Sequence, residues 1–211
     1  MNFKGIELCC PQCHGELRRP VTGEMVCQGC ARRYPVVLDI PDLRIAPDPY
    51  IGIDEEYTKI EKLVARYADF DFEGFVEYYY SITSVVPVHH ARAYTRGLLA
   101  GEQRARAWLE DWEAASAGAA GTPGGSRGAL LEVGCGTGPL LVAAERYTPR
   151  AGVDIALRWL VVAKKRLERT RADLPLIAAC AETLPFREPA FDRVVFDSAL
   201  EHVRDQRKNA G

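Results

Sequence analysis

ALLEVGCGTG, the stretch Ala129–Gly138, changes character halfway along. Its first half, Leu130–Val133, has the side chains of a buried strand. Pro139 opens the apolar run LLVAAERY directly afterwards, and three glycines stand between the two at alternate positions: Gly134, Gly136 and Gly138. Glycine permits positive φ and close approach of a ligand to the backbone, and proline is favoured at the first position of a helix. The stretch therefore predicts a strand, a tight turn and a helix that begins at Pro139.

An acid stands at the end of the next strand-like run. Ala151–Ile155 contains Asp154, sixteen residues beyond Gly138. A glycine turn followed by an acid at the tip of the second strand suits a nucleoside ligand, because ribose hydroxyls need a carboxylate acceptor. The dinucleotide fingerprint G-x-G-x-x-G requires its third glycine at position 139, where this sequence has proline, so the spacing does not match a dinucleotide site. Taken alone, the turn is also compatible with an α/β strand end that binds nothing.

Three segments carry a family resemblance. EVGCGTG (Glu132–Gly138) resembles the first motif of class I S-adenosylmethionine (SAM)-dependent methyltransferases. AETLPF (Ala181–Phe186) and FDRVVFDSALEHV (Phe191–Val203) are similar to later segments of the ubiquinone- and menaquinone-biosynthesis type, the methyltransferase type 11-like group. The resemblance implies an α/β, Rossmann-like class I methyltransferase sheet and an enzyme that transfers a methyl group from SAM. A nicotinamide-dependent oxidoreductase is the disfavoured alternative.

The resemblance also assigns site residues. Asp154 would hold the ribose diol, and Glu132 would order the amino group of the cofactor's methionine part. Cys180 stands where the family often has Asp, which leaves backbone contacts to the adenine. His202 is a candidate catalytic base for a hydroxyl or an acidic carbon, with a structural role as the alternative. The full set expected to bind the cofactor is Glu132, Gly134, Cys135, Gly136, Gly138, Asp154, Ile155, Ala181, Glu182 and Asp197.

Two cysteine pairs near the N-terminus predict a metal site. Cys10 and Cys13 form one C-x-x-C, Cys27 and Cys30 form the other, and thirteen residues separate the pairs. Two such knuckles bring four thiolates onto one Zn²⁺ and leave no position for a catalytic water. A block of about 45 residues buries too little apolar surface to fold unaided, so the metal would stabilise it. A redox dithiol or chance spacing is the alternative.

The same block, Ile6–Arg44, resembles the zinc ribbon of the small activator protein of tRNA and protein methyltransferases. The resemblance rests on C-P-x-C, C-x-x-C, Y-P-V and the ending I-P-D-L. It implies a module that docks a partner or presents a substrate. Leu38-Asp39 departs from the Asp-Gly that the family more often has before Ile-Pro, so we expect a different turn there.

Bulk composition excludes some classes of function. The 211 residues carry a net charge of −2, so no general basic field favours nucleic acid. The N-terminus lacks the apolar core of a secretory signal, and no apolar run is long enough to span a membrane. Seven cysteines then indicate metal ligands or free thiols, and a cytoplasmic location.

Four regions are expected along the chain: a zinc ribbon (1–46), a helical cap (47–116), a flexible Gly/Ala/Pro linker (117–128) and a partial SAM-binding domain (129–211). Helical periodicity is expected from Asp54, over Phe70–Tyr80 and from His89 to Ala115. Tyr78–Tyr80 and His89-His90 are substrate-pocket candidates, or simply part of the cap. An amphipathic helix over 156–171 should turn its basic side chains outward, to solvent or to RNA: Lys164, Lys165, Arg166, Arg169 and Arg171.

The chain stops just past the fourth strand of the expected sheet. A complete class I fold of the resembled family has seven strands, in the order 3-2-1-4-5-7-6. We therefore expect strands one to four here, with the C-terminal strands missing. The acceptor is unidentified; a small molecule is slightly favoured over RNA or protein, and the ribbon offers a surface for a protein partner. The alternative function is a non-catalytic, truncated methyltransferase that acts as an interaction module.

Overall fold

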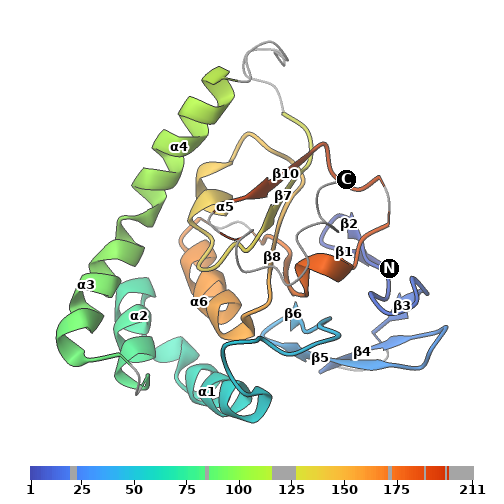
Figure 1. The fold of residues 1–211 in the computed structure, drawn as a ribbon, viewed down its shortest axis with the longest axis horizontal. Coiled ribbons are helices and arrows are strands. Elements are labelled where there is room, and N and C mark those ends of the chain that lie inside the picture. The colour runs from blue at the N-terminus through green and yellow to red at the C-terminus, as the bar shows by residue number, and fades with distance from the viewer. Residues whose placement is uncertain are drawn as a thin grey trace.

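The computed structural model describes residues 1–19, 23–83, 86–115, 127–170, 173–187, 189–197 and 199. Figure 1 shows a central sheet with helices along one side and a small, separate group of strands on the other. Helices in these ranges are all too short or too polar to cross a membrane.

The central sheet has four parallel strands: β7 (Leu130–Val133), β8 (Arg150–Asp154), β9 (Leu176–Ala178) and β10 (Arg193–Phe196). Their spatial order is β10-β7-β8-β9, with Leu130 opposite both Arg150 and Arg193. In order of appearance along the chain this is 4-1-2-3, the order expected for the first four strands of a class I methyltransferase sheet. The α/β fold class is confirmed.

The N-terminal strands form two small antiparallel units. β1 (Asn2–Phe3) pairs with β2 (Ile6–Glu7), and a second sheet contains, in order, β3 (Leu17–Arg18), β4 (Glu24–Cys27), β5 (Arg33–Val37) and β6 (Ile40–Pro41). The β5–β6 turn has φ of 47° at Leu38 and 63° at Asp39, both in the left-handed region. The Asp39 carboxylate is held by ion pairs with Lys4 and Arg19. The turn forms without glycine, and leucine in this conformation carries backbone strain.

The helices before the central sheet are α1 (Ile53–Ala65), the 3₁₀ turn η1 (Tyr67–Asp69), α2 (Phe72–Ser81), α3 (Val88–Leu99) and α4 (Gly101–Ala115). The segment from His89 to Ala115, expected as one helix, is two helices that meet at Ala100. A Cβ on Gly101 would lie 3.3 Å from the Cβ of Pro139, so glycine lets α4 approach α5 (Pro139–Ala143) closely there. The helix after the glycine turn begins at Pro139, as predicted.

Each face of the central sheet is covered by a different part of the chain. On one face, α6 (Leu157–Glu168) packs with α1 and α2 in a core that includes Phe75, Leu160 and Ala178. On the other face, side chains of β7, β8 and β9 pack against the N-terminal strands. That second core contains Leu8, Leu17, Met25, Tyr34, Leu43, Leu131, Val153 and Ile177. The ribbon therefore shares a hydrophobic core with the sheet.

Main-chain pairing extends the contact at the edge of the sheet. Asp42 forms a parallel bridge with Ala178 of β9, and the Leu43 N–H donates to the Ala178 carbonyl at 2.8 Å. Leu8 forms an antiparallel bridge with Phe186. Edge strands expose unpaired N–H and C=O groups. The segment that follows β6 therefore provides hydrogen-bond partners for part of the β9 edge.

Not all basic side chains of α6 point outward, which corrects the prediction from its sequence. Arg166 is fully buried and Lys165 is 9% exposed. Arg166 donates to the Thr137 carbonyl at 2.8 Å and the Leu98 carbonyl at 2.8 Å, and it pairs with Glu102. A guanidinium has five donors, so one buried side chain can tie the glycine turn to the junction of α3 and α4.

Candidate cofactor site and metal centre

The glycine turn after β7 has the geometry that its sequence predicts. Gly134, Gly136 and Gly138 have φ of 77°, 50° and 71°. The N–H groups of Gly134 and Cys135 both donate to the Val153 carbonyl, at 2.7 and 3.0 Å. A Cβ on Gly134 would lie 2.2 Å from the Cβ of Ala199, so a side chain would be excluded even without the strain of positive φ.

Asp154 stands beside this turn at the end of β8. One carboxylate oxygen accepts from the Gly136 N–H at 2.8 Å, and the other accepts from the Ala156 N–H at 2.8 Å. Burial raises the pKa of Asp154 above its usual range. These two bonds and the nearby Arg158 lower the pKa and offset only part of that shift. Each oxygen keeps a second lone pair. The carboxylate is therefore oriented by the backbone and can still accept two ligand hydroxyls.

A cavity of about 450 Å³ opens at the carboxyl ends of β7, β8 and β9. Ligands of open parallel sheets bind at this end of the strands. Six of the predicted cofactor residues line it: Gly134, Gly136, Asp154, Ile155, Ala181 and Glu182. The remaining lining includes Asp48, Pro49, Tyr50, Arg158, Trp159 and Ala199.

Glu132 lies behind the cavity in β7 and does not line it. The residue is 4% exposed, and its Oε2 atom has no hydrogen-bond partner among the described residues. Burial, followed by the nearby carboxylates of Asp197 and Asp154, raises the pKa of Glu132 well above the usual range of a glutamate. Three acids thus meet at the ends of β7, β8 and β10. A positively charged ligand group would complement them.

The other predicted cofactor residues have supporting positions. The buried Cys135 side chain packs under Gly152, where an added Cβ would lie 2.7 Å from the Cys135 Sγ atom. Gly138 caps α5, and its N–H donates to the Cys135 carbonyl at 2.8 Å. Asp197 is exposed at the end of β10. His202, together with the rest of the L-E-H-V segment, lies outside the described residues.

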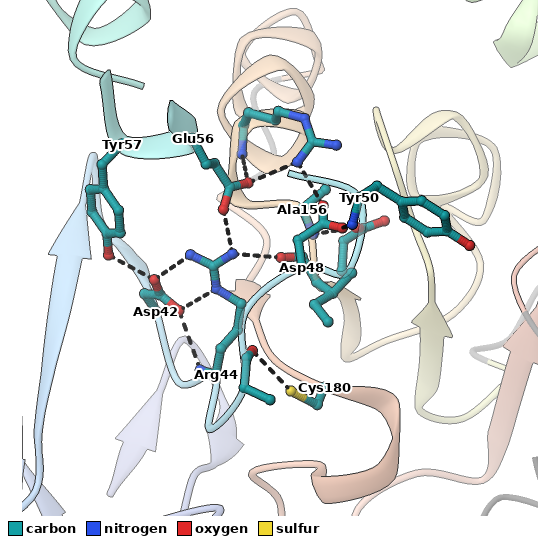
Figure 2. Close-up of polar contacts among 12 residues, drawn as sticks. Asp42, Arg44, Asp48, Tyr50, Glu56, Tyr57, Ala156 and Cys180 are labelled. Carbon is teal, nitrogen blue, oxygen red and sulfur yellow. Dashed lines mark hydrogen bonds and ion pairs between the residues drawn. The ribbon is translucent and has the colours of Figure 1, made fainter. Parts of the chain in front are cut away.

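A buried charge network joins the end of the ribbon to the cofactor cavity (Figure 2). Arg44 lies between two acids and donates to both oxygens of Asp42, at 2.7 and 2.6 Å, and also to Glu56 of α1. It also donates to the Ile155 carbonyl at 2.9 Å, next to Asp154. Tyr57 donates to Asp42 at 2.7 Å, and burial beside that acid raises the pKa of Tyr57.

A second arginine continues the network at the start of α6. Arg158 donates to Asp48 at 2.7 Å and to Glu56 at 3.0 Å. These two acids raise the pKa of Arg158 in spite of the opposing effect of burial. Because Glu56 pairs with Arg44 and Arg158, the loop after β6, helix α1 and helix α6 share one set of ion pairs.

Sequence reasoning missed Asp48, Tyr50, Arg158 and Trp159. The segment 46–50 has the composition of a hinge, and its fold over the carboxyl ends of the strands depends on pairing across 110 residues. Cys180 stands where the resembled family often has an Asp, and no side-chain contact to the adenine was expected from it. It is buried, does not line the cavity, and donates from its Sγ atom to the Ala46 carbonyl at 3.5 Å (Figure 2).

The four predicted metal ligands come together in the ribbon. The sulfurs of Cys10, Cys13, Cys27 and Cys30 all lie within 4.8 Å of one another, with 3.8 Å between Cys10 and Cys30 and 3.4 Å between Cys13 and Cys27. Zinc–sulfur bonds of about 2.3 Å in a tetrahedron place the sulfurs about 3.8 Å apart. The Gly29 N–H donates to the Cys27 Sγ at 3.3 Å. The donor set fits a structural zinc ion.

Comparisons with known proteins agree with both parts. Residues 130–210 match the family described as a methyltransferase domain. Residues 8–37 match the family of Trm112p-like proteins. The chain thus carries a methyltransferase domain preceded by a Trm112p-like zinc ribbon.

An uncharacterised protein of Methanocaldococcus jannaschii is 34% identical over 79 residues, which are 37% of this chain and 28% of that protein. The chain thus spans under a third of this curated relative. Among solved structures, DesVI of Streptomyces venezuelae is 25% identical, with a TM-score of 0.40, over 57% of this chain and 56% of its own. The SAM-bound amino pentose methyltransferase CalS10 of Micromonospora echinaspora is 26% identical, with a TM-score of 0.42, over 59% of this chain and 49% of its own.

Proposed function

We propose that the protein is a SAM-dependent methyltransferase. The observation that carries the proposal is the cavity at the carboxyl ends of β7, β8 and β9, with the Asp154 carboxylate at its wall and the glycine turn beneath it. The methyltransferase-domain match over residues 130–210 supports it. SAM would supply a methyl group on a sulfonium, and its positive charge suits a cavity with the Asp154 carboxylate at its wall and the carboxyls of Glu132 and Asp197 near it.

The residues take separate roles in this proposal. Asp154 holds the ribose hydroxyls, Glu132 orders the charged amino end through a water from behind the cavity, and the glycine turn allows close backbone approach. Ala181 and Glu182 border the adenine from the loop after β9. Such a site accelerates transfer mainly by positioning donor and acceptor. His202 remains a proposed general base, and Cys135, Gly136, Gly138, Ile155 and Asp197 remain proposed parts of the cofactor site.

The proposal assigns the four regions of the chain distinct tasks. The zinc ribbon (1–46) is a docking module, the helices of 47–116 cap the cofactor site, and 129–211 holds the cofactor. The fourth region, 117–128, is proposed as a linker, and all of it except residues 127 and 128 lies outside the described residues. The acceptor is proposed to be a small molecule rather than RNA or protein. The seven cysteines form no disulfide with one another, which favours the cytoplasm. The second candidate function is a non-catalytic methyltransferase relative that uses its ribbon to bind a partner.

Calorimetric titration of SAM and S-adenosylhomocysteine into the 211-residue, zinc-loaded chain tests the proposal. We expect dissociation constants of about micromolar size, and binding at least tenfold weaker in Asp154→Ala, because the variant loses a charge-assisted acceptor. Glu110→Ala, which removes an exposed acid on α4, should bind like the wild type. NAD, titrated in parallel, should show no heat.

Each outcome has a defined meaning. Binding that disappears in Asp154→Ala, while the unfolding midpoint is retained, supports the cofactor site. A folded, zinc-loaded chain that binds neither SAM nor its product overturns the proposal and favours the interaction module. Binding of NAD in place of SAM would favour an oxidoreductase.

A further inference from the structure

A second cavity of about 670 Å³ adjoins the cofactor cavity on the side of α1 and α2. Tyr50, Arg158 and Trp159 line both cavities. The second cavity also contains side chains of α1, the end of α2 and the start of the following segment. A molecule bound there would face the cofactor cavity across these three shared side chains.

Aromatic rings form the wall of this second cavity. Tyr79 stacks on Trp159 with ring centroids 4.4 Å apart and planes 30° from parallel. Tyr80 lies against Tyr79 and approaches Tyr94 with centroids 5.9 Å apart. Broad ring faces favour planar ligands, which can stack in an offset arrangement. Tyr78 stacks on Phe70, and neither Tyr78 nor the His89-His90 pair lines this cavity, so the predicted pocket residues are only partly represented.

The charged side chains of the cavity are three basic ones and one acid: Lys59, Lys62, Arg158 and Glu55. Arg158 is already paired with Asp48 and Glu56. Lys59 makes no ion pair with any described carboxylate; its Nζ atom donates to the Thr83 hydroxyl and lies 4.1 Å from the centroid of the Tyr79 ring. Burial, together with Arg158, lowers the pKa of Lys59 to about 8, although Glu55 opposes the shift.

We propose that the second cavity takes the methyl acceptor, and that the acceptor is a planar small molecule with an anionic group bound by Lys59. The inference rests on the proposed function, because it takes the neighbouring cavity as the SAM site. Stacking against Tyr80 or Trp159, both of which are partly exposed, would hold the ring of the acceptor. A charge-assisted bond from Lys59 would hold its anion. The anion would also serve as an ion-pair partner for this half-buried lysine, which has none among the described carboxylates.

Calorimetry with three probes at pH 7 tests both parts of the inference. The probes are 4-hydroxybenzoate, its neutral analogue 4-hydroxybenzamide, and inorganic phosphate. Each is titrated into the full chain alone and into the chain saturated with S-adenosylhomocysteine. We expect the benzoate to bind about tenfold or more tightly than the amide and than phosphate, since hydrogen bonds to charged groups are the stronger ones.

Matched lysine variants assign the preference to the cavity. Lys59→Met should bind the benzoate no better than the amide, and Lys59→Arg should keep the preference because it keeps the charge. Lys164→Met removes a lysine of α6 outside this cavity and should leave all affinities unchanged. Unfolding midpoints show whether each variant is folded.

The outcomes separate the inference from the function on which it rests. If S-adenosylhomocysteine binds but the benzoate has no preference over the amide, or keeps it in Lys59→Met, the inference is wrong and the proposed function stands. Phosphate that binds as tightly as the benzoate excludes the planar acceptor. If S-adenosylhomocysteine does not bind, the proposed function fails, and titration of the chain alone still decides whether the cavity selects a planar anion.

Discussion

Glu132 shows how one residue can link a ligand's charge to pH. Its buried carboxyl lies near Asp197 and Asp154, and its raised pKa means that it holds a proton at pH values where an exposed glutamate is ionised. A bound cation would favour the ionised form. Binding of SAM should therefore release a proton, and its affinity should rise with pH below the raised pKa of ligand-free Glu132 and level off above it.

Calorimetry in buffers of different ionisation enthalpy measures this proton release. At pH values below the raised pKa of ligand-free Glu132 we expect a proton release in the wild type and a much smaller one in Glu132→Gln, which keeps the shape of the side chain without a titrating group. An equal release in both proteins would assign the proton to another group, such as Asp154.

At the level of elements, Arg44 joins three parts of the chain that are far apart in sequence. It pairs with Asp42 at the end of the ribbon and Glu56 on α1, and it donates to the loop after β8. Arg44→Met should lower the free energy of unfolding by about 3–5 kcal/mol, because it leaves the buried Asp42 without a cation and takes from the buried Glu56 one of its two arginine partners. Urea unfolding measures the loss.

Arg66→Met is the matched control. Arg66 pairs with Asp69, and about half of each side chain is exposed, so we expect a change below about 1 kcal/mol. A loss in Arg44→Met that is no larger than in this control would show that solvent compensates the buried acids.

Sequence reasoning succeeded where the signal is local. The glycine turn, the place of Asp154 at the end of β8 and the clustering of four cysteines follow from short motifs with fixed spacing, and the binding roles of these residues stay predictions. It failed where long-range contacts decide. The basic residues of α6 were predicted to point outward, yet Arg166 is buried and binds Thr137, Leu98 and Glu102. Asp48 and Trp159 belong to no motif, and the place of Asp48 at the cavity depends on its ion pair with Arg158 across 110 residues.

On the scale of the whole molecule, the ribbon covers one face of the central sheet and part of its β9 edge. Removing zinc with a strong chelator should therefore destabilise the methyltransferase domain as well. We expect a lower unfolding temperature and increased light scattering, because apolar side chains of β7, β8 and β9 become exposed. Adding zinc back should reverse the change.

Substitutions of the adjacent residues Cys9 and Cys10 provide a matched comparison. Cys10→Ser removes a predicted ligand and should lower zinc content and the unfolding temperature together. Cys9→Ser changes the neighbouring buried thiol, whose Sγ atom lies 3.9 Å from His14 Nδ1, and should keep one zinc per chain. A stable, zinc-free Cys10→Ser protein would contradict a folding role for the metal.

The ribbon and the sheet also lie on one polypeptide, and only the segment 45–52 separates Arg44 from α1, which packs with α6 on the opposite face of the sheet. Short tethers of this kind give effective concentrations of about millimolar. The contact is therefore unimolecular, and its occupancy is independent of how much protein is present. Dilution leaves the sheet covered, and a separate ribbon-bearing protein could displace the tethered one only by exceeding that local concentration or by binding more tightly.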